Sequence, residues 1–230
     1  MEKQQKGKQI PKEVKKERKR PQGEFRDKER TKMKLLQAVG EIIRTEGYTA
    51  LGVNKISHKA GVNKKLIYRY FDNVDSLIEK YVREKDYWAS LFDNTGIAEI
   101  DLSNIGHHTF SDLLDKQLDT LYDSEELKNI LLWEISENNA LIRELAGVRE
   151  NRASELLKLS DSFFDKTSID LRALTALQTA GIYYLILHAR HSGDAFCEID
   201  MNTEEGKNRI KQIITQINTW AFKEVKKVKR

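Results

Sequence analysis

A group of polar side chains in this sequence suits contact with nucleic acid rather than catalysis. A short helix is expected from Asn63, as its N-cap, to about Phe71. The side chains on its outward face are Asn63, Lys64, Lys65, Tyr68 and Arg69. Such groups donate hydrogen bonds to base edges and phosphate oxygens at the N-terminal end of a recognition helix. A generic helical hairpin would explain the apolar spacing, but not this gathering of basic and tyrosyl groups.

No catalytic constellation emerges from the rest of the chain. The sequence has no glycine-rich phosphate loop and no HExxH, GxSxG or CxxC motif. His188 and His191, with Asp194 and Cys197 nearby, have a spacing that permits metal ligation, but surface or core histidines are much commoner. His107 and His108 are expected in a loop. We therefore predict a protein that is not an enzyme and that holds neither a metal nor a cofactor.

The polar face needs a scaffold, and the sequence predicts three helices for it. Apolar residues at helical spacing indicate a first helix over about 26–46. A second, short helix runs from Val53 to Ala60, Gly61 ends it, and the third follows directly. Two short helices joined by a tight turn around a glycine are the sequence form of a helix-turn-helix.

Charge is divided unevenly along the 230 residues. The net charge is +4, but residues 1–71 carry +12 and the remainder carries −8. A basic N-terminal third suits a polyanion, whereas an acidic remainder repels one, although charge runs alone are usually solvated faces. Residues 1–24 are polar and lysine-rich, so we expect a disordered arm. Attraction to DNA phosphate and a merely solubilising tail are equally good interpretations of this arm.

Composition restricts the class of protein further. The chain has two prolines and one cysteine, Cys197, which favours helices and excludes an intrachain disulfide framework. No apolar stretch is long enough for a membrane span, and the N-terminus lacks the apolar block of a signal peptide. We therefore expect a soluble cytoplasmic protein with no membrane partner.

Three segments in order carry a more specific resemblance. They are Gly47-Tyr48, then Val53-Asn54-Lys55-Ile56-Ser57-His58-Lys59-Ala60-Gly61-Val62-Asn63, then Ile67-Tyr68-Arg69-Tyr70-Phe71, with Asp75 and Leu77 following. Over about residues 26–81 the sequence resembles the DNA-binding domain of the TetR (tetracycline repressor) family. The resemblance implies an all-α fold, with a three-helix helix-turn-helix domain at 25–72. A helical effector-binding and dimerisation domain would follow at 73–230.

The resemblance also implies a function. It indicates a homodimeric transcriptional regulator, typically a repressor that a small-molecule ligand releases from double-stranded operator DNA. By position, Lys64, Lys65 and Asn54 would contact bases, and Thr49, Tyr68 and Tyr70 would contact phosphates.

Four positions depart from the family pattern: Gly52, Lys65, Leu66 and Val74. Val74 matters most, because a lysine there commonly opens the next helix and contacts phosphate. These departures motivate two alternatives: a TetR-like scaffold that acts as a protein-interaction module, and a non-specific nucleic-acid binder.

Helical spacing continues through the C-terminal part. The expected helices span about 74–92, 109–122, 125–136, 140–164, 170–191 and 204–226. Ser124 and Thr203, each followed by two glutamates, are expected N-caps. The last two helices are the expected dimer interface, although the same residues could pack within their own subunit. The interface candidates are Leu174, Leu177, Ala180, Gly181, Tyr184, Ile210, Ile213, Ile214, Ile217 and Trp220.

An effector pocket would lie among the middle helices, for an effector that we expect to be largely apolar. Aromatic residues at helical spacing are its candidate lining, with Gln178 and His188 as polar anchors. The candidates are Trp88, Phe92, Phe110, Tyr122, Trp133, Gln178, Tyr183, Tyr184 and His188. Aromatics with this spacing are also common in ordinary cores.

Overall fold

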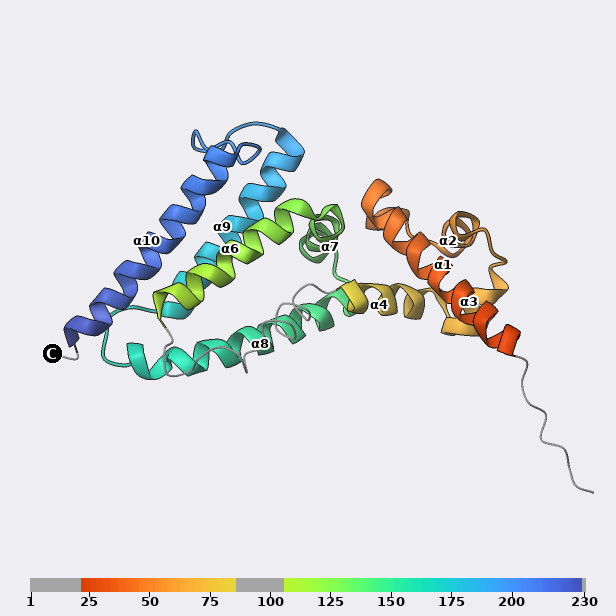
Figure 1. The fold of residues 1–230 in the computed structure, drawn as a ribbon, viewed down its shortest axis with the longest axis horizontal. Coiled ribbons are helices and arrows are strands. Elements are labelled where there is room, and N and C mark those ends of the chain that lie inside the picture. The colour runs from red at the N-terminus through yellow and green to blue at the C-terminus, as the bar shows by residue number, and fades with distance from the viewer. Residues whose placement is uncertain (1–21, 86–105, 229–230) are drawn as a thin grey trace, which may run out of the picture.

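The computed structural model describes residues 22–85 and 106–228, and regular structure in these ranges is helical apart from one isolated bridge between Phe196 and Ile199. The all-α fold expected from the sequence is therefore present. Figure 1 shows the N-terminal helices as one group and the later helices as a larger group joined to it. The expectations for the arm up to residue 21, for Trp88 and for Phe92 lie outside the described residues.

The N-terminal group contains α1 (Gln22–Glu46), the short 3-10 turn η1 (Tyr48–Ala50), α2 (Val53–Ala60), α3 (Lys65–Phe71) and α4 (Val74–Lys85). Residues 22–24, which the sequence assigned to the disordered arm, belong to α1. Pro21 directly precedes them in the sequence, and proline is common where a helix begins. Gly61 ends α2 in the left-handed conformation, at φ 63° and ψ 36°. That conformation, which glycine adopts without strain, makes the turn into α3.

One close approach fixes the core of this group. The buried core includes Ile42, Ile56 and Ile67, all with no exposed surface. At Gly40 in α1, an added Cβ would lie only 2.0 Å from the phenol oxygen of Tyr81 in α4. Glycine at this position therefore lets α4 pack directly on α1.

The larger group contains α6 (His107–Asp123), α7 (Glu125–Ser136), α8 (Ala140–Phe164), α9 (Leu171–Ser192) and α10 (Glu204–Val228). Ser124 and Thr203 cap α7 and α10 as expected: their hydroxyls accept from Leu127 N at 3.2 Å and Gly206 N at 3.0 Å.

The expectation of a loop at His107 and His108 is wrong, because these residues form the first turn of α6. Gly106 is the N-cap, and its backbone N–H donates to Thr109 Oγ1 at 3.3 Å. This contact closes the turn before the apolar pattern of the helix begins, so periodicity alone starts the helix too late.

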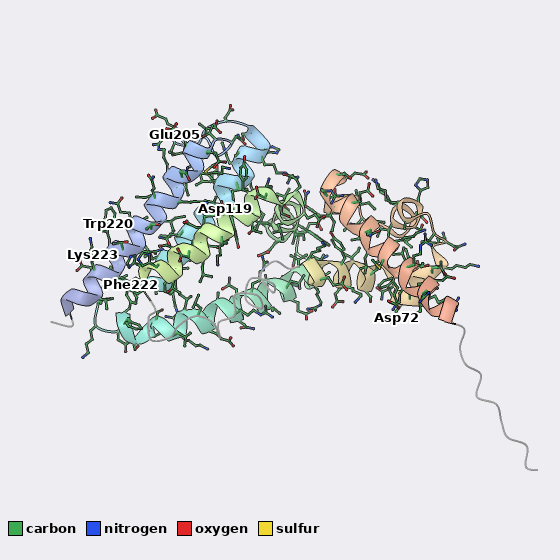
Figure 2. The ribbon with its side chains drawn as sticks, viewed as in Figure 1. Asp72, Asp119, Glu205, Trp220, Phe222 and Lys223 are labelled. Atoms are coloured by element: carbon green, nitrogen blue, oxygen red, sulfur yellow. The ribbon has the colours of Figure 1, made fainter. Side chains whose placement is uncertain are left out.

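Helix α6 is the central element of this group and packs against both α9 and α10 (Figure 1). At the far end from the N-terminal group, Phe222 of α10 contacts Phe110 and Phe164, with ring centroids 5.9 and 5.0 Å apart. Figure 2 labels Phe222 on the side of α10 that faces α6, and Trp220 on the outer side. Helix α10 therefore has one packed face and one exposed face.

The two groups are joined through α7, α8 and α4. Asn129 of α7 donates its amide Nδ2 to the backbone oxygen of Ile43 in α1, at 2.9 Å. Trp133 of α7 stacks on Tyr48, with ring centroids 5.2 Å apart. Among the described residues, no helix is long and apolar enough to span a membrane.

Candidate DNA-reading face and effector cavity

The N-cap of α3 is Lys64 and not Asn63, which the sequence predicted, but Asn63 still bonds the first turn. Its side-chain Oδ1 accepts a hydrogen bond from the backbone N–H of Lys65 at 2.9 Å, and its backbone oxygen accepts from Leu66 N at the same distance. The backbone N–H groups at a helix start have no partner within the helix, so this side chain satisfies one of them. Asn63 thus has a structural task besides any contact with DNA.

Helix α3 separates its residues into an inner and an outer face. Ile67 and Phe71 are buried in the N-terminal core. Lys64, Lys65 and Arg69 are exposed, as is Tyr68, with 52% of its surface accessible. Exposed Asn54 of α2 extends this surface, since Lys64 Nζ lies 3.5 Å from Asn54 Oδ1. We call the surface formed by Asn54, Asn63, Lys64, Lys65, Tyr68 and Arg69 the reading face.

The basic groups of the reading face differ from other lysines of the same domain. Lys59 pairs with Glu41 at 2.8 Å, and Lys55 pairs with Glu46. Within the part of the chain that the structure describes, Lys64, Lys65 and Arg69 pair with no carboxylate. An exposed cation without a carboxylate keeps its full attraction for a phosphate or a base acceptor.

Thr49 and Tyr70 are the remaining DNA-contact candidates. Thr49 is exposed in η1. Tyr70 is half-buried, and the cations of Lys28 and Arg69 each lie 5.8 Å from its ring centroid. Cation–π contacts of this kind hold basic side chains close to the ring. Tyr70 therefore packs against the core and also positions two cations.

The turn between α3 and α4 explains what Val74 does instead of the usual lysine. Val74 is half-buried and packs against the N-terminal core. Asn73 caps α4, with its Oδ1 accepting from Ser76 N at 2.7 Å. Asp72, labelled in Figure 2, takes a left-handed φ of 67° that sets the direction of α4 after α3. This junction is fixed by capping and packing.

A cavity of about 570 Å³ lies between α6, α8 and α9, with Glu134 of α7 also on its wall. Half of its lining residues are apolar: Phe110, Leu113, Leu114, Ala146, Ala153, Leu156, Leu157, Ala176 and Ala180. Glu150, Ser154, Arg172, Thr175 and Thr179 also line it. Its volume falls within the range of about 300–1,000 Å³ that is typical of small-molecule sites. Exposed Ala176 and Ala180 form part of its wall, so the cavity reaches the surface along α9.

One end of the cavity is polar. Arg149 of α8 pairs with Glu134 of α7, with 15% and 25% of their side chains exposed. Gln117 and Tyr183 line the same end, and burial raises the pKa of the Tyr183 phenol. A smaller cavity of about 40 Å³, which Val82 of α4 also lines, shares Gln117, Arg149 and Tyr183 with the large one.

Of the predicted pocket residues that the structure describes, Phe110 and Tyr183 line this cavity. Trp133 instead stacks on Tyr48 and donates its indole N–H to Glu137, because α7 turns that face toward the N-terminal domain. Tyr122 lies under the cation of Lys207, 4.3 Å from the ring centroid.

Three more predicted pocket residues lie elsewhere on α9. Tyr184 is 53% exposed, and it packs against His188 and Phe196 with ring centroids 5.7 and 5.0 Å away. Gln178 is partly buried but is not part of the cavity wall. These residues follow a different face of α9 from Tyr183, so they do not line this cavity.

Sequence reasoning missed Gln117, Glu134 and Arg149. The available signal was the set of small residues spaced along two facing helices, Ala146 and Ala153 on α8 and Ala176 and Ala180 on α9. Small side chains leave space where larger ones would fill it. Ala180, which the sequence predicts at the dimer interface, also lines the cavity.

The dimer candidates divide into exposed and internal residues. Leu177, Tyr184, Ile213 and Trp220 are large apolar side chains with 73%, 53%, 40% and 53% of their surface exposed. Ile214 is buried within its own chain, and Leu174 and Ile210 pack against internal clusters. Gly181 and Ile217 are partly exposed.

The comparisons with known proteins agree with this architecture. Residues 35–81 match the family described as bacterial regulatory proteins, tetR family. The search of curated proteins found no match.

Solved structures resemble the chain over most of its length. The FadR regulator of Bacillus subtilis, in complex with stearoyl-CoA, shares 18% identity over 80% of this chain and 97% of its own, with a TM-score of 0.56. A regulator from Aquifex aeolicus VF5 shares 19% identity over 81% of this chain and 99% of its own, at 0.57. NalD of Pseudomonas aeruginosa, a repressor of an efflux pump, shares 17% identity over 83% of this chain and 97% of its own, with a TM-score of 0.55. At these identities the likeness shows the fold.

A helix-turn-helix with an exposed, unpaired basic face, joined to a helical body, defines a DNA-binding transcriptional regulator. Within that class, the helix-turn-helix segment at residues 35–81 is similar to that of the tetR family of bacterial regulatory proteins.

Proposed function

We propose that this chain is a homodimeric repressor that a small molecule releases from operator DNA. The observation that carries the proposal is the reading face, where Lys64, Lys65 and Arg69 are exposed without a carboxylate partner in the described residues. Each subunit would place α3 in a major groove. The two half-sites would lie about 34–36 Å apart, or a multiple of that distance.

The exposed apolar rows of α9 and α10 support a dimer. Leu177, Tyr184, Ile213 and Trp220 would lose their contact with water if two subunits packed these helices together. A symmetric interface would also set the distance between the two reading faces. We propose that these four residues form its apolar centre.

The cavity supports the response to a ligand. Its volume and its apolar lining residues suit an organic molecule of moderate size. The B. subtilis FadR structure of the same fold is described in complex with stearoyl-CoA, and NalD is described as a repressor. We propose a DNA-binding domain at 25–72 and an effector and dimerisation domain at 73–230. We also propose that the protein acts as a regulator and not as an enzyme, in the cytoplasm where it reaches the operator.

Selection of binding sites from random duplex DNA tests this function. Full-length protein at moderate salt should enrich an inverted repeat whose half-sites are one helical turn, or a multiple of it, apart. A Lys59→Ala variant serves as the matched control, because Lys59 belongs to the same domain but pairs with Glu41. It should enrich the same repeat. Enrichment of no motif would contradict sequence-specific binding, and would favour the non-specific or protein-interaction alternatives.

A further inference from the structure

The polar end of the cavity collects hydrogen-bond donors. Gln117 is only 4% exposed, and its amide Nε2 interacts with the Tyr183 phenol but has no partner at full hydrogen-bond geometry among the described residues. A buried amide whose hydrogen bonds are incomplete has donor capacity for an acceptor that is supplied from outside. Because Gln117 lines the cavity, a ligand can reach it there.

Arg149 adds a positive charge at the same end. It pairs with Glu134, and the carboxylate is the more exposed member of the pair, at 25% against 15%. Glu134 can therefore return to water more easily than Arg149. An incoming anion would gain a charge-assisted hydrogen bond from the guanidinium when Glu134 leaves. Glu150 of α8 also lines the cavity, but it is exposed, so water screens its charge more than that of the Arg149–Glu134 pair.

The rest of the cavity determines what must be attached to this anionic group. From Arg172 to Tyr183 the α9 side of the wall extends about 16 Å, at 1.5 Å per helical residue. Alanines and threonines line that length on α9, and leucines with Phe110 line the α6 and α8 sides. An elongated apolar chain would bury its surface against them.

We propose that the effector is an elongated aliphatic carboxylate, whose head group binds Arg149 and Gln117 in place of Glu134. The proposal rests on the ligand-responsive function proposed above, and names the class of ligand. Its carboxylate accepts from the guanidinium and the amide, while the protonated Tyr183 phenol lines the same site.

Release of Glu134 would act on the joint between the two groups of helices. Glu134 belongs to α7, next to Trp133, which stacks on Tyr48. The same helix holds Ile43 of α1 through Asn129. A ligand that removes the Arg149–Glu134 contact therefore frees one side of the helix whose other side contacts the DNA-binding domain.

Calorimetric titration of the full-length protein without DNA tests the ligand class. Sodium dodecanoate should bind at least about tenfold more tightly than dodecan-1-ol, dodecylammonium or dodecanoyl-CoA, because only the free acid offers a carboxylate. Arg149→Gln should reduce dodecanoate affinity about tenfold, to that of the alcohol, and Gln117→Leu should reduce it by a smaller factor. Glu134→Gln should increase it, since the competing charge is gone. Arg143→Gln, an exposed position on the same helix, is the control and should match wild type.

Thermal melts monitored by circular dichroism would establish that each variant is folded. Equal binding of acid and alcohol, tighter binding of the amine or the thioester, or an unchanged affinity in folded Arg149→Gln would each overturn the proposal. Release of the selected duplex is measured separately. If dodecanoate binds through Arg149 but leaves the duplex bound, the ligand assignment stands and ligand-induced release fails. If another class of compound releases the duplex while dodecanoate does not bind, the assignment fails and the proposed function stands.

Discussion

The reading face and the polar end of the cavity hold their charges in opposite ways. On α3, Lys64 and Lys65 are exposed and have no carboxylate beside them in the described structure. In the cavity, Arg149 is largely buried and paired with Glu134. Without DNA, a surface cation is solvated by water at little cost. A buried cation needs an internal counter-charge until a ligand takes the place of that counter-charge. The difference predicts salt-dependent binding at the first site and competitive binding at the second.

The largest expected effect concerns the dimer that would place two reading faces on one DNA. Leu177→Glu with Trp220→Glu puts charges on the exposed apolar rows of α9 and α10. The double variant should be monomeric in sedimentation, and its affinity for a two-half-site duplex should fall by about a hundredfold or more. Ile135→Glu changes an equally exposed apolar residue of α7, and this control should remain dimeric. A dimeric double variant would place the interface elsewhere.

The next effect concerns the packing that holds α4 against α1. Gly40→Ala places a Cβ 2.0 Å from the Tyr81 phenol oxygen and displaces the ring, which also donates to Glu126 at 2.7 Å. We expect the free energy of unfolding in urea to fall by about 1–3 kcal/mol. At Gly147 in α8, an added Cβ would meet no packed neighbour within 4 Å. Gly147→Ala should therefore stabilise the protein by about 0.5–1 kcal/mol. Equal effects of the two changes would contradict the close approach of α4 to α1.

A smaller effect concerns the hydrogen bond between Asn129 of α7 and Ile43 of α1, which joins the larger group of helices to the N-terminal group. Asn129→Leu removes the hydrogen bond to Ile43 O and the one that Arg190 donates to Asn129 at 3.1 Å. The expected loss of stability is about 1–2 kcal/mol, and ligand should then change the affinity for DNA less than in wild type. Asn138→Leu, an exposed position after α7, is the control. Unchanged coupling in Asn129→Leu would show that another contact carries the signal.

The smallest effect is a pH dependence at the same joint. Burial alone would raise the pKa of Glu125, but Lys128 and Arg190 hold it below its ordinary value. A carboxylate with a lowered pKa stabilises the folded state above its unfolded value of about 4.3, and this contribution disappears as the pH falls through the folded value. The melting temperature of Glu125→Gln should therefore lie below that of wild type at pH 7, and the gap should close below pH 4. A gap that persists in acid would contradict the ionic contribution.

The two sites also differ in how far the sequence could predict them. The helix-turn-helix followed from local rules, because Gly61, Asn63 and the apolar spacing each act within a few residues. The cavity depends on which faces of α6, α8 and α9 meet, and this is a property of packing at long range. Aromatic content could not distinguish Tyr183, which lines the cavity, from its neighbour Tyr184, which is exposed.

The helix limits show the same distinction. The range predicted for α7 agrees with the structure because Ser124 caps it locally. The start of α6 was predicted too late, because its first turn is set by Gly106 and Thr109 and not by apolar residues. Glu134 and Arg149 could not be paired from the sequence, since the contact depends on how α7 meets α8.

The most direct test of the central claim measures the affinity of full-length protein for the selected duplex and for a scrambled duplex, by fluorescence anisotropy. The wild-type protein should prefer the selected duplex by at least about a thousandfold. Lys64→Ala with Lys65→Ala should weaken binding to it by about a hundredfold and remove most of the preference, while Lys59→Ala should behave as wild type. If the double variant bound the selected duplex as tightly as wild type, the face of α3 would not be the surface that reads DNA.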